Sequence, residues 1–468
     1  MSRHRSKVRG NFDWITLWIL LSIMTIGWLM IYAVEYQDSI DTSIFNFSTS
    51  YGKQLVWIGL AMVVLTASII INPVFWKVFS YPILLLACIS LVLILFFGVE
   101  IKGSQSWFTF GAFSVQPGEL AKFPALIALA SFLSFHKTDL TTNKGFFSSL
   151  ALIGLPVGLI MLQPDAGMAI TYSALLVVLY REGAHPIWFI ALFAIVMLFI
   201  ASIIFDSFLV IFALLVIGSI LIVFHLPNRH PWILAFLLSL TLAILIMFLD
   251  WKVGSMVLMA LFFLTALVFL LTTREQRLVF LYGPAILLAS LFSFSTTYTF
   301  DNVLKPHQQD RINVWLQPSL SDPHGSRYNV LQSQLAIGSG GLTGKGFLNG
   351  TLTKLNYVPE QNTDFIFVTV GEEQGFLGGA AVIILYAILI SRIFLIGEKM
   401  KGVFERAYAY GVGGFLFIHF MINIGMTMGL MPVIGIPLPF MSYGGSSLMV
   451  FTLMMGVLLR LDYERRIS

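Results

Sequence analysis

The sequence predicts an all-α protein that crosses a membrane many times. Hydrophobic residues make up 58% of its 468 residues, and charged residues make up only 11%. Apolar runs of about 20 residues, the length at which a helix spans the hydrocarbon core, recur along the whole chain. Because the bilayer interior offers no water to an open backbone, such runs form helices, and one helical bundle is expected.

Roughly 14 membrane helices follow from these runs. They lie near residues 14–34, 53–71, 77–98, 119–134, 147–163, 166–180, 186–204, 207–224, 231–249, 254–272, 279–295, 365–392, 406–428 and 444–461. The first run follows a basic segment and is longer than the apolar core of a signal peptide, so it predicts a retained span.

The basic residues predict the orientation of the spans. Threading the chain from a cytoplasmic N-terminus places most Lys and Arg of the short loops inside, as the positive-inside rule requires. Both termini are then cytoplasmic. The expected parts are N-terminal core spans (1–185), inserted or peripheral spans with the last span before the loop (186–295), a large outer loop (296–364) and C-terminal core spans (365–468).

Composition also excludes several classes of function. The basic residues form no patch with interleaved aromatic residues, so no nucleic acid partner is expected. The single cysteine, Cys88, cannot form an internal disulfide. No Gly-rich phosphate loop ending in Lys and Ser or Thr is present, so a substrate outside must carry its own activation or be moved by a gradient.

The polar segment 305–374 is expected to be the working part, since long ordered loops are more often functional than mere connections. It enters an apolar helix through Asn362, Thr363 and Asp364. Asp364 could cap that helix, a role open to Asn362 and Thr363 as well, or it could act as an acid or base.

Charged residues elsewhere near the apolar runs have two interpretations. Glu119 and Lys122 are spaced to share one helix face, either as a helix start with an interfacial lysine or as a cation facing a polar cavity. Asp165 fits a helix N-cap as well as a catalytic role. Glu372, beside a second glutamate, must have a partner in the bilayer, and Lys122 and Arg311 are the candidates.

Residues 422–447 are too rich in Pro and Gly to form a straight helix. Irregular backbone at membrane depth survives where it lines protein or a wet cavity. We therefore expect a cavity wall near Ser442 and Tyr443.

Six motifs together resemble those of the SEDS peptidoglycan polymerases. They are QPGELAK (116–122), LQPDAG (162–167), DRINVWLQP (310–318), RYNVLQSQLAIGSGGLTGKGFLNGT (327–351), VPEQNTDFIFVTVGEEQG (358–375) and PVIGIPLPFMSYGGSS (432–447). They come in the order of that family, and GSGGLTGKG is more similar to its elongation members than to its division members. Ser106 departs from the pattern, because relatives commonly carry a basic residue there.

The resemblance implies a SEDS-like helical bundle, with a ten-span core and about four extra spans between Asp165 and Arg311. It implies an enzyme of cell elongation and shape that polymerises glycan strands from lipid II, with a class B penicillin-binding protein as partner. The location implied is the outer face of the bacterial cytoplasmic membrane. It also implies that Asp364 is catalytic, that Glu119 and Lys122 line the central cavity, and that Arg311 matches a family arginine.

Glycan extension needs a base for the incoming sugar hydroxyl and positive charge for the departing diphosphate. Asp364 fits the base. The expected substrate-binding residues are Lys122, Glu119, Arg311, Asp165, Glu372, Ser442 and Tyr443, with a divalent cation (Mg or Mn) as a possible cofactor whose ligands are unknown. Two alternatives are a flippase or transporter of lipid-linked sugars and an enzyme like the O-antigen ligases.

Overall fold

The computed structural model divides the chain into two compact units. Unit 1 comprises Met1–Pro186 and Pro323–Ser468, and unit 2 comprises Ile187–Asp322. The residues described are 12–36, 45–101, 104–110, 113–135, 138–224, 276–322, 325–355 and 357–467, with the single positions 253, 257 and 260. Each unit is treated by itself below.

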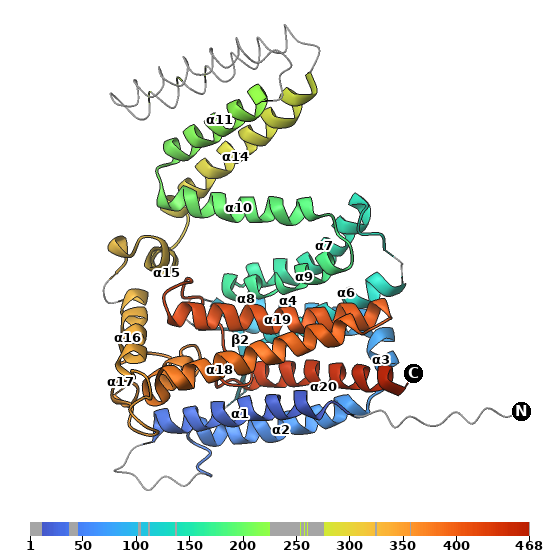
Figure 1. The fold of residues 1–468 in the computed structure, drawn as a ribbon, viewed down its shortest axis with the longest axis vertical. Coiled ribbons are helices and arrows are strands. Elements are labelled where there is room, and N and C mark those ends of the chain that lie inside the picture. Colours follow the sequence, from blue (N-terminus) through green and yellow to red (C-terminus); the bar gives the residue numbers. More distant parts are fainter. Residues whose placement is uncertain are drawn as a thin grey trace, which may run out of the picture. The chain divides into compact units, whose positions relative to one another are not determined.

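Unit 1 is a helical bundle with one small antiparallel sheet (Figure 1). Its first elements are α1 (Trp14–Glu35), α2 (Ser50–Ile70), α3 (Pro73–Val78), α4 (Ser80–Phe97), β1 (Val99–Ile101), β2 (Ser104–Phe110), β3 (Phe113–Val115), α5 (Pro117–Leu120), α6 (Lys122–Phe135), α7 (Asn143–Met161), α8 (Ala166–Thr171) and α9 (Ala174–Arg181). After unit 2 follow α16 (Ser326–Ser339), α17 (Thr351–Lys354), α18 (Ile366–Glu398), α19 (Val403–Thr427) and α20 (Gly445–Ile467).

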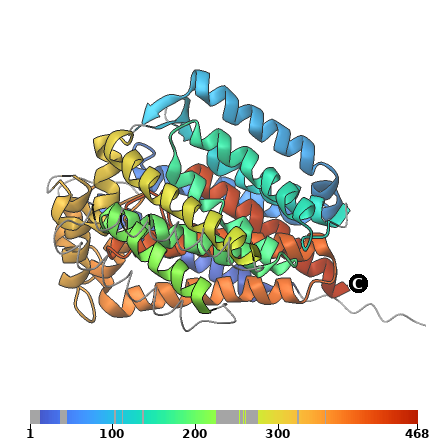
Figure 2. The same cartoon turned by 90° about the horizontal axis from the view of Figure 1, so that it is seen from above.

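The core of unit 1 lies around α6, α19 and α20. Between 72% and 83% of the most apolar stretch of each of these helices is buried within the protein, against 22% for α2 and 28% for α4. In Figure 2, α4 accordingly lies at the edge of the bundle, and the small sheet follows at its end. Peripheral helices that stay apolar on their exposed faces are what lipid contact requires.

Unit 2 contains α10 (Pro186–Ile204), α11 (Ser207–Phe224), α14 (Gln276–Asn302), α15 (Pro306–Leu316) and the short 3₁₀ helix η1 (Pro318–Leu320). Hydroxyl groups join its helices: Ser202 Oγ donates to Ser293 Oγ at 2.9 Å, and Ser207 Oγ donates to Thr297 Oγ1 at 2.9 Å. Small hydroxyl side chains allow close approach and satisfy one another in an apolar setting.

The described residues contain nine helices long and apolar enough to cross a membrane. They match nine of the predicted spans, while the predicted spans 166–180 and 207–224 coincide with shorter apolar helices. The predicted span 279–295 falls within α14, and spans 231–249 and 254–272 lie outside the described residues. The total of 14 and the four-part division of the chain stay predictions.

Two parts of the chain differ from the sequence-based expectation. The predicted loop 296–364 is largely helical, since it holds the end of α14 and all of α15, η1, α16 and α17. These helices are short and polar, so they carry no long apolar period by which they could be found. The strands β1, β2 and β3 pair in chain order, with Val99 opposite Trp107 and Phe108 opposite Val115, which the sequence analysis did not predict.

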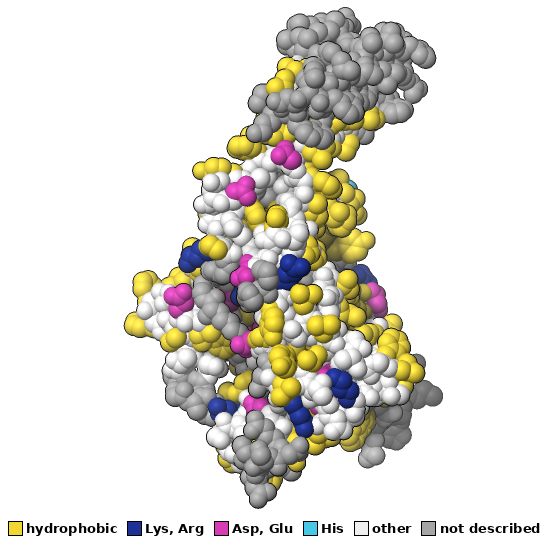
Figure 3. All heavy atoms as spheres, turned by 90° about the vertical axis from the view of Figure 1, so that its left-hand side faces the viewer, with side chains coloured by type: hydrophobic (Ala, Val, Ile, Leu, Met, Phe, Trp, Pro, Cys, Tyr) yellow, Lys and Arg dark blue, Asp and Glu magenta, His cyan; other side chains and the backbone are white. Residues whose placement is uncertain are grey.

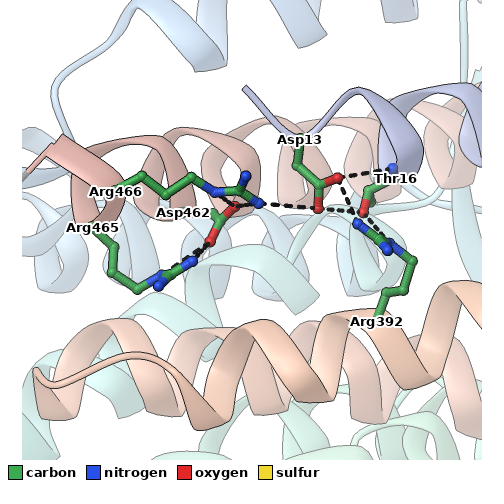
Figure 4. Close-up of polar contacts among 6 residues, drawn as sticks. All are labelled: Asp13, Thr16, Arg392, Asp462, Arg465 and Arg466. Carbon is green, nitrogen blue, oxygen red and sulfur yellow. Dashed lines mark hydrogen bonds and ion pairs between the residues drawn. The ribbon is translucent and has the colours of Figure 1, made fainter. Parts of the chain in front are cut away.

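Ion pairs join α1, α18 and α20 at the end of unit 1 where α1 begins and α20 ends (Figure 4). Asp13 accepts from Arg392 at 2.6 Å, and buried Asp462 pairs with Arg465 and Arg466 at 2.7 and 2.6 Å. Burial acts to raise the pKa of Asp13, but hydrogen bonds from Thr16 and the charge of Arg392 hold it below its usual value. The start of α1 and the end of α20 are therefore held at the same end of unit 1.

Candidate active site

A pocket of about 590 Å³ opens at the opposite end of unit 1, where α1 ends and α2 begins. It is lined by Val34, Glu35, Ser50, Lys354, Val358, Pro359, Glu360, Gln361, Asn362, Thr363 and Tyr443. Seen from this end, the protein displays acidic and basic side chains between apolar ones (Figure 3). The pocket therefore combines charged and apolar lining residues, as ligand sites commonly do.

Glu35, at the end of α1, connects two other segments that line this pocket. Its Oε1 accepts from Asn362 Nδ2 at 3.1 Å, and its Oε2 accepts from the Ser50 backbone N–H at 2.7 Å. Burial and the nearby Glu35 carboxylate raise the pKa of Tyr443, so its hydroxyl stays protonated at neutral pH. The backbone N–H of Tyr443 donates to Asn362 O at 2.8 Å. Tyr443 thus belongs to the pocket wall, as predicted for its segment.

Asp364 follows the pocket-lining residues directly and is half-buried. The N-cap of α18 is Phe365, without a side-chain cap hydrogen bond, and Asp364 stands one residue before it. Its backbone carbonyl accepts from Asn423 Nδ2 at 2.8 Å. Gly435, with φ +74°, approaches the carboxylate so closely that a Cβ there would lie 3.1 Å from Asp364 Oδ2. Glycine at this position leaves room beside the carboxylate.

Lys122 is fully buried and lies in a cluster of polar groups. Its Nζ lies 2.8 Å from Glu119 Oε1 and 2.7 Å from His419 Nε2, and it faces the Phe451 ring at 5.7 Å. His419 Nδ1 lies 3.0 Å from the Pro437 carbonyl, which can only accept, so Nδ1 carries the hydrogen and Nε2 accepts from Lys122. The predicted placement of Glu119 and Lys122 on one face is confirmed, and the ammonium is enclosed rather than interfacial.

Asp165 is the N-cap of α8, as one of its two interpretations predicted. Its Oδ1 accepts from the Met168 backbone N–H at 3.0 Å, and its Oδ2 accepts from Gln116 Nε2 at 2.9 Å. It also interacts electrostatically with Lys122. The carboxylate therefore joins the LQPDAG and QPGELAK segments.

Glu372 is fully buried and paired with Lys345 at 2.5 Å, not with Lys122. The same carboxylate accepts backbone N–H groups from Thr351, Leu352 and Thr353, each at 2.9 Å, so it binds the start of α17. The sequence suggested the wrong partner because the true one is a loop residue whose approach depends on the fold.

The glycines of the two motifs around Glu372 fit against each other. Gly375 interrupts α18 with φ +65°, and a Cβ on it would lie 2.3 Å from the Gly344 backbone nitrogen. A Cβ on Gly344 would lie 2.1 Å from the Glu373 carbonyl oxygen. Only glycine permits both the close approach and the positive φ. GSGGLTGKG and GEEQG therefore form one folded unit, which carries α17 and the segment leading to Asp364.

We expect Glu372→Gln to lower the free energy of unfolding by about 3–5 kcal/mol, because it leaves the Lys345 charge and several buried N–H groups without a carboxylate. The measurement is the unfolding transition of the purified protein in detergent. Glu373→Gln is the matched control, since Glu373 is equally buried but accepts from Leu348 N–H at a longer 3.2 Å. Equal losses from the two variants would contradict this assignment.

Ser442 serves the irregular segment between α19 and α20. Its Oγ accepts from the Leu438 backbone N–H at 2.9 Å, and its carbonyl accepts from Gln54 Nε2 at 3.4 Å. The predicted non-helical backbone is confirmed, because α19 ends at Thr427 and α20 begins at Gly445. Ser442 is nearly buried and closes a turn in this segment.

The remaining site predictions concern Arg311 and a metal ion. Arg311 lies on α15, which belongs to unit 2. Within the described ranges, no group of three or more His, Cys, Asp or Glu side chains is placed to hold a metal ion. The side chains described here thus do not by themselves form a metal site.

The sequence analysis did not single out several residues of this site, namely His419, Asn423, Lys345 and Glu35. His419 and Asn423 are polar residues within an apolar run, which is itself a signal of function or of a buried partner. They stand four residues apart and so share a face of α19. Lys345 carried no comparable signal, because it lies in a polar segment.

Comparison with known proteins shows to which family the chain belongs. The FtsW/RodA/SpoVE family model, described as "Cell cycle protein", matches residues 13–230 and 208–467. The peptidoglycan glycosyltransferase RodA of Treponema pallidum is 30% identical, over 97% of this chain and 99% of that protein. The peptidoglycan glycosyltransferase MrdB of Escherichia coli K12 is 27% identical, over 97% and 95%. The probable peptidoglycan glycosyltransferase FtsW of Idiomarina loihiensis is 27% identical, over 97% and 88%.

Two solved structures share the fold. A chain from work on "Structural coordination of polymerization and crosslinking by a peptidoglycan synthase complex" has a TM-score of 0.62 at 22% identity, covering 97% of this chain and 98% of that one. The crystal structure of Thermus thermophilus RodA has a TM-score of 0.54 at 22% identity, with the same coverage. The chain therefore belongs to the FtsW/RodA/SpoVE family, the SEDS family of peptidoglycan glycosyltransferases.

Proposed function

We propose that this protein polymerises glycan strands from lipid II on the outer face of the cytoplasmic membrane, with Asp364 as the general base. The observation that carries the proposal is the position of Asp364. It directly follows the charged pocket-lining segment, and its backbone carbonyl accepts from Asn423 of α19, which also donates to Ile436 O in the irregular segment before α20. A carboxylate at the edge of a polar pocket and the start of a membrane helix can meet a substrate whose lipid stays in the bilayer.

The chemistry follows from the substrate class. The 4-hydroxyl of the acceptor sugar attacks the anomeric carbon of the donor sugar, which carries the lipid diphosphate. The proton of that hydroxyl passes to Asp364. The bond from that carbon to the diphosphate breaks, and the lipid diphosphate leaves with the electron pair. One displacement inverts an α-linked donor into a β-linked strand, so one base suffices and no glycosyl-enzyme intermediate is needed.

Positive charge must meet the departing diphosphate. Lys354 lines the pocket, and Lys122 is enclosed with Glu119 and His419. Contact between Lys122 and a diphosphate thus requires this enclosed cluster to become accessible. Arg311 is proposed as a further cation for the diphosphate, as its match to a family arginine implies. A divalent cation on the diphosphate would take most of its ligands from substrate and water, as Mg²⁺ commonly does.

We further propose an elongation role, cytoplasmic termini and a class B penicillin-binding protein as partner. The elongation role rests on the similarity of GSGGLTGKG to the elongation members of the family, and the relatives include both RodA at 30% and FtsW at 27% identity. The peptidoglycan synthase complex among the related structures supports a crosslinking partner. A flippase of lipid-linked sugars is the rival, and it would move lipid II without consuming it.

The test is incubation of the purified protein with labelled lipid II, with and without its penicillin-binding partner. Long glycan strands on a denaturing gel are the expected product. Movement of labelled lipid II across a vesicle bilayer without strand formation would favour the flippase instead. An O-antigen ligase-like enzyme would transfer a preformed chain to an acceptor and would leave lipid II alone unpolymerised.

A further inference from the structure

Asn423 of α19 is fully buried and contacts the backbone of the proposed base, Asp364. Its Nδ2 donates to two backbone carbonyls, that of Asp364 at 2.8 Å and that of Ile436 at 2.7 Å. Both partners can only accept, so the nitrogen of the amide must face them, and both of its hydrogens are used. One side chain thus joins the residue that opens α18 to the irregular segment between α19 and α20.

The other end of the same amide indicates why an asparagine is present. Asn423 Oδ1 is buried and has no hydrogen-bond partner among the described residues. An unsatisfied buried acceptor costs about 1–3 kcal/mol, so an apolar residue would suit the packing of α19 better. The two donated hydrogen bonds are therefore the purpose of the side chain.

His419, one turn earlier on α19, makes a parallel connection. Its Nδ1 binds Pro437 O, the carbonyl next to that of Ile436, and its Nε2 meets Lys122. The face of α19 therefore holds neighbouring carbonyls of one irregular segment, which links the surroundings of Asp364 to those of Lys122.

We propose that Asn423 is a positioning residue that sets where the Asp364 carboxylate stands by clamping the Asp364 and Ile436 carbonyls together. The inference rests on the proposed role of Asp364 as the base. Gly435, which leaves room for the carboxylate, is the neighbour of clamped Ile436, so the clamp fixes both the base and the space beside it. Misplacement of a reacting group by about 1 Å can cost about 100-fold in rate.

The test replaces the clamp without touching the base. Asn423→Leu keeps the branching and the number of heavy atoms of the side chain and removes both donors, and we expect kcat to fall by about 10- to 100-fold while KM changes by less than about twofold. Asn423→Ser, too short to hold both carbonyls, serves if the leucine variant does not fold. The matched control is Thr427→Val, one turn further along α19, which removes a buried hydroxyl whose hydrogen bond among the described residues goes to Ile424 O of the same helix. It should retain the wild-type rate.

Combination with Asp364→Asn separates positioning from general damage. If Asn423 acts through Asp364, the residual rate of Asp364→Asn is not lowered further by Asn423→Leu, because the effects of residues that act as a unit do not add. A further loss of the same size in the double variant, or a wild-type rate in a folded Asn423 variant, would overturn the inference. Full activity of Asp364→Asn itself would instead refute the proposed function.

Discussion

Asp364→Asn should lower the rate of strand synthesis by about 100- to 10,000-fold, the usual contribution of a general base. The amide has the size of the carboxylate, and the clamp from Asn423 reaches the backbone carbonyl, which the substitution leaves in place. Folding should therefore be unchanged. The measurement is glycan strand formation from labelled lipid II, with the unfolding transition and partner binding recorded on the same preparation.

The control for this variant is the same chemical change away from the pocket. Asp139 stands in an exposed turn, where its carboxylate accepts from Thr141, and Asp139→Asn should retain the wild-type rate. If Asp364→Asn kept most of its activity in a folded protein, Asp364 would not be the base. Glu372 would then be a poor replacement, because it is fully buried in its network with Lys345 and α17.

The parts of the fold that sequence could predict are those with local signals. Long apolar runs locate the nine described membrane-length helices, and the spacing of Glu119 and Lys122 places them on one face. Asp165 caps a helix because the cap is encoded within three residues. In the same way, the Pro and Gly residues between Thr427 and Gly445 predict irregular backbone, whatever the orientation of the neighbouring spans in the membrane.

What sequence could not predict depends on contacts between distant residues. His419 meets Lys122 across 297 positions, and Glu35 meets Asn362 across 327. No local period encodes such pairs, since they arise when helices pack. The Glu372 partner was mistaken for the same reason: Lys345 is one of several cations in polar segments, and only the fit of Gly344 against Gly375 brings it to the carboxylate.

Lys122→Met should reduce both stability and activity. A second substitution, at Glu119, allows the two effects to be separated. Methionine keeps the apolar stem but leaves the buried Glu119 carboxylate without its cation, which costs about 3–5 kcal/mol. The expected result is a clearly lowered unfolding transition together with strand synthesis reduced by at least about tenfold, as loss of a charge that stabilises the leaving group requires.

The double variant Lys122→Met with Glu119→Gln decides what the activity loss means. Neutralising Glu119 removes the unpaired charge, so the unfolding transition should return toward the wild-type value. If Lys122 supplies positive charge to the diphosphate, strand synthesis stays low, because no cation has been restored to the cluster with His419. Recovery of the wild-type rate in the double variant would show instead that Lys122 only neutralises Glu119, and the charge for the diphosphate would then have to come from the pocket side, where Lys354 stands.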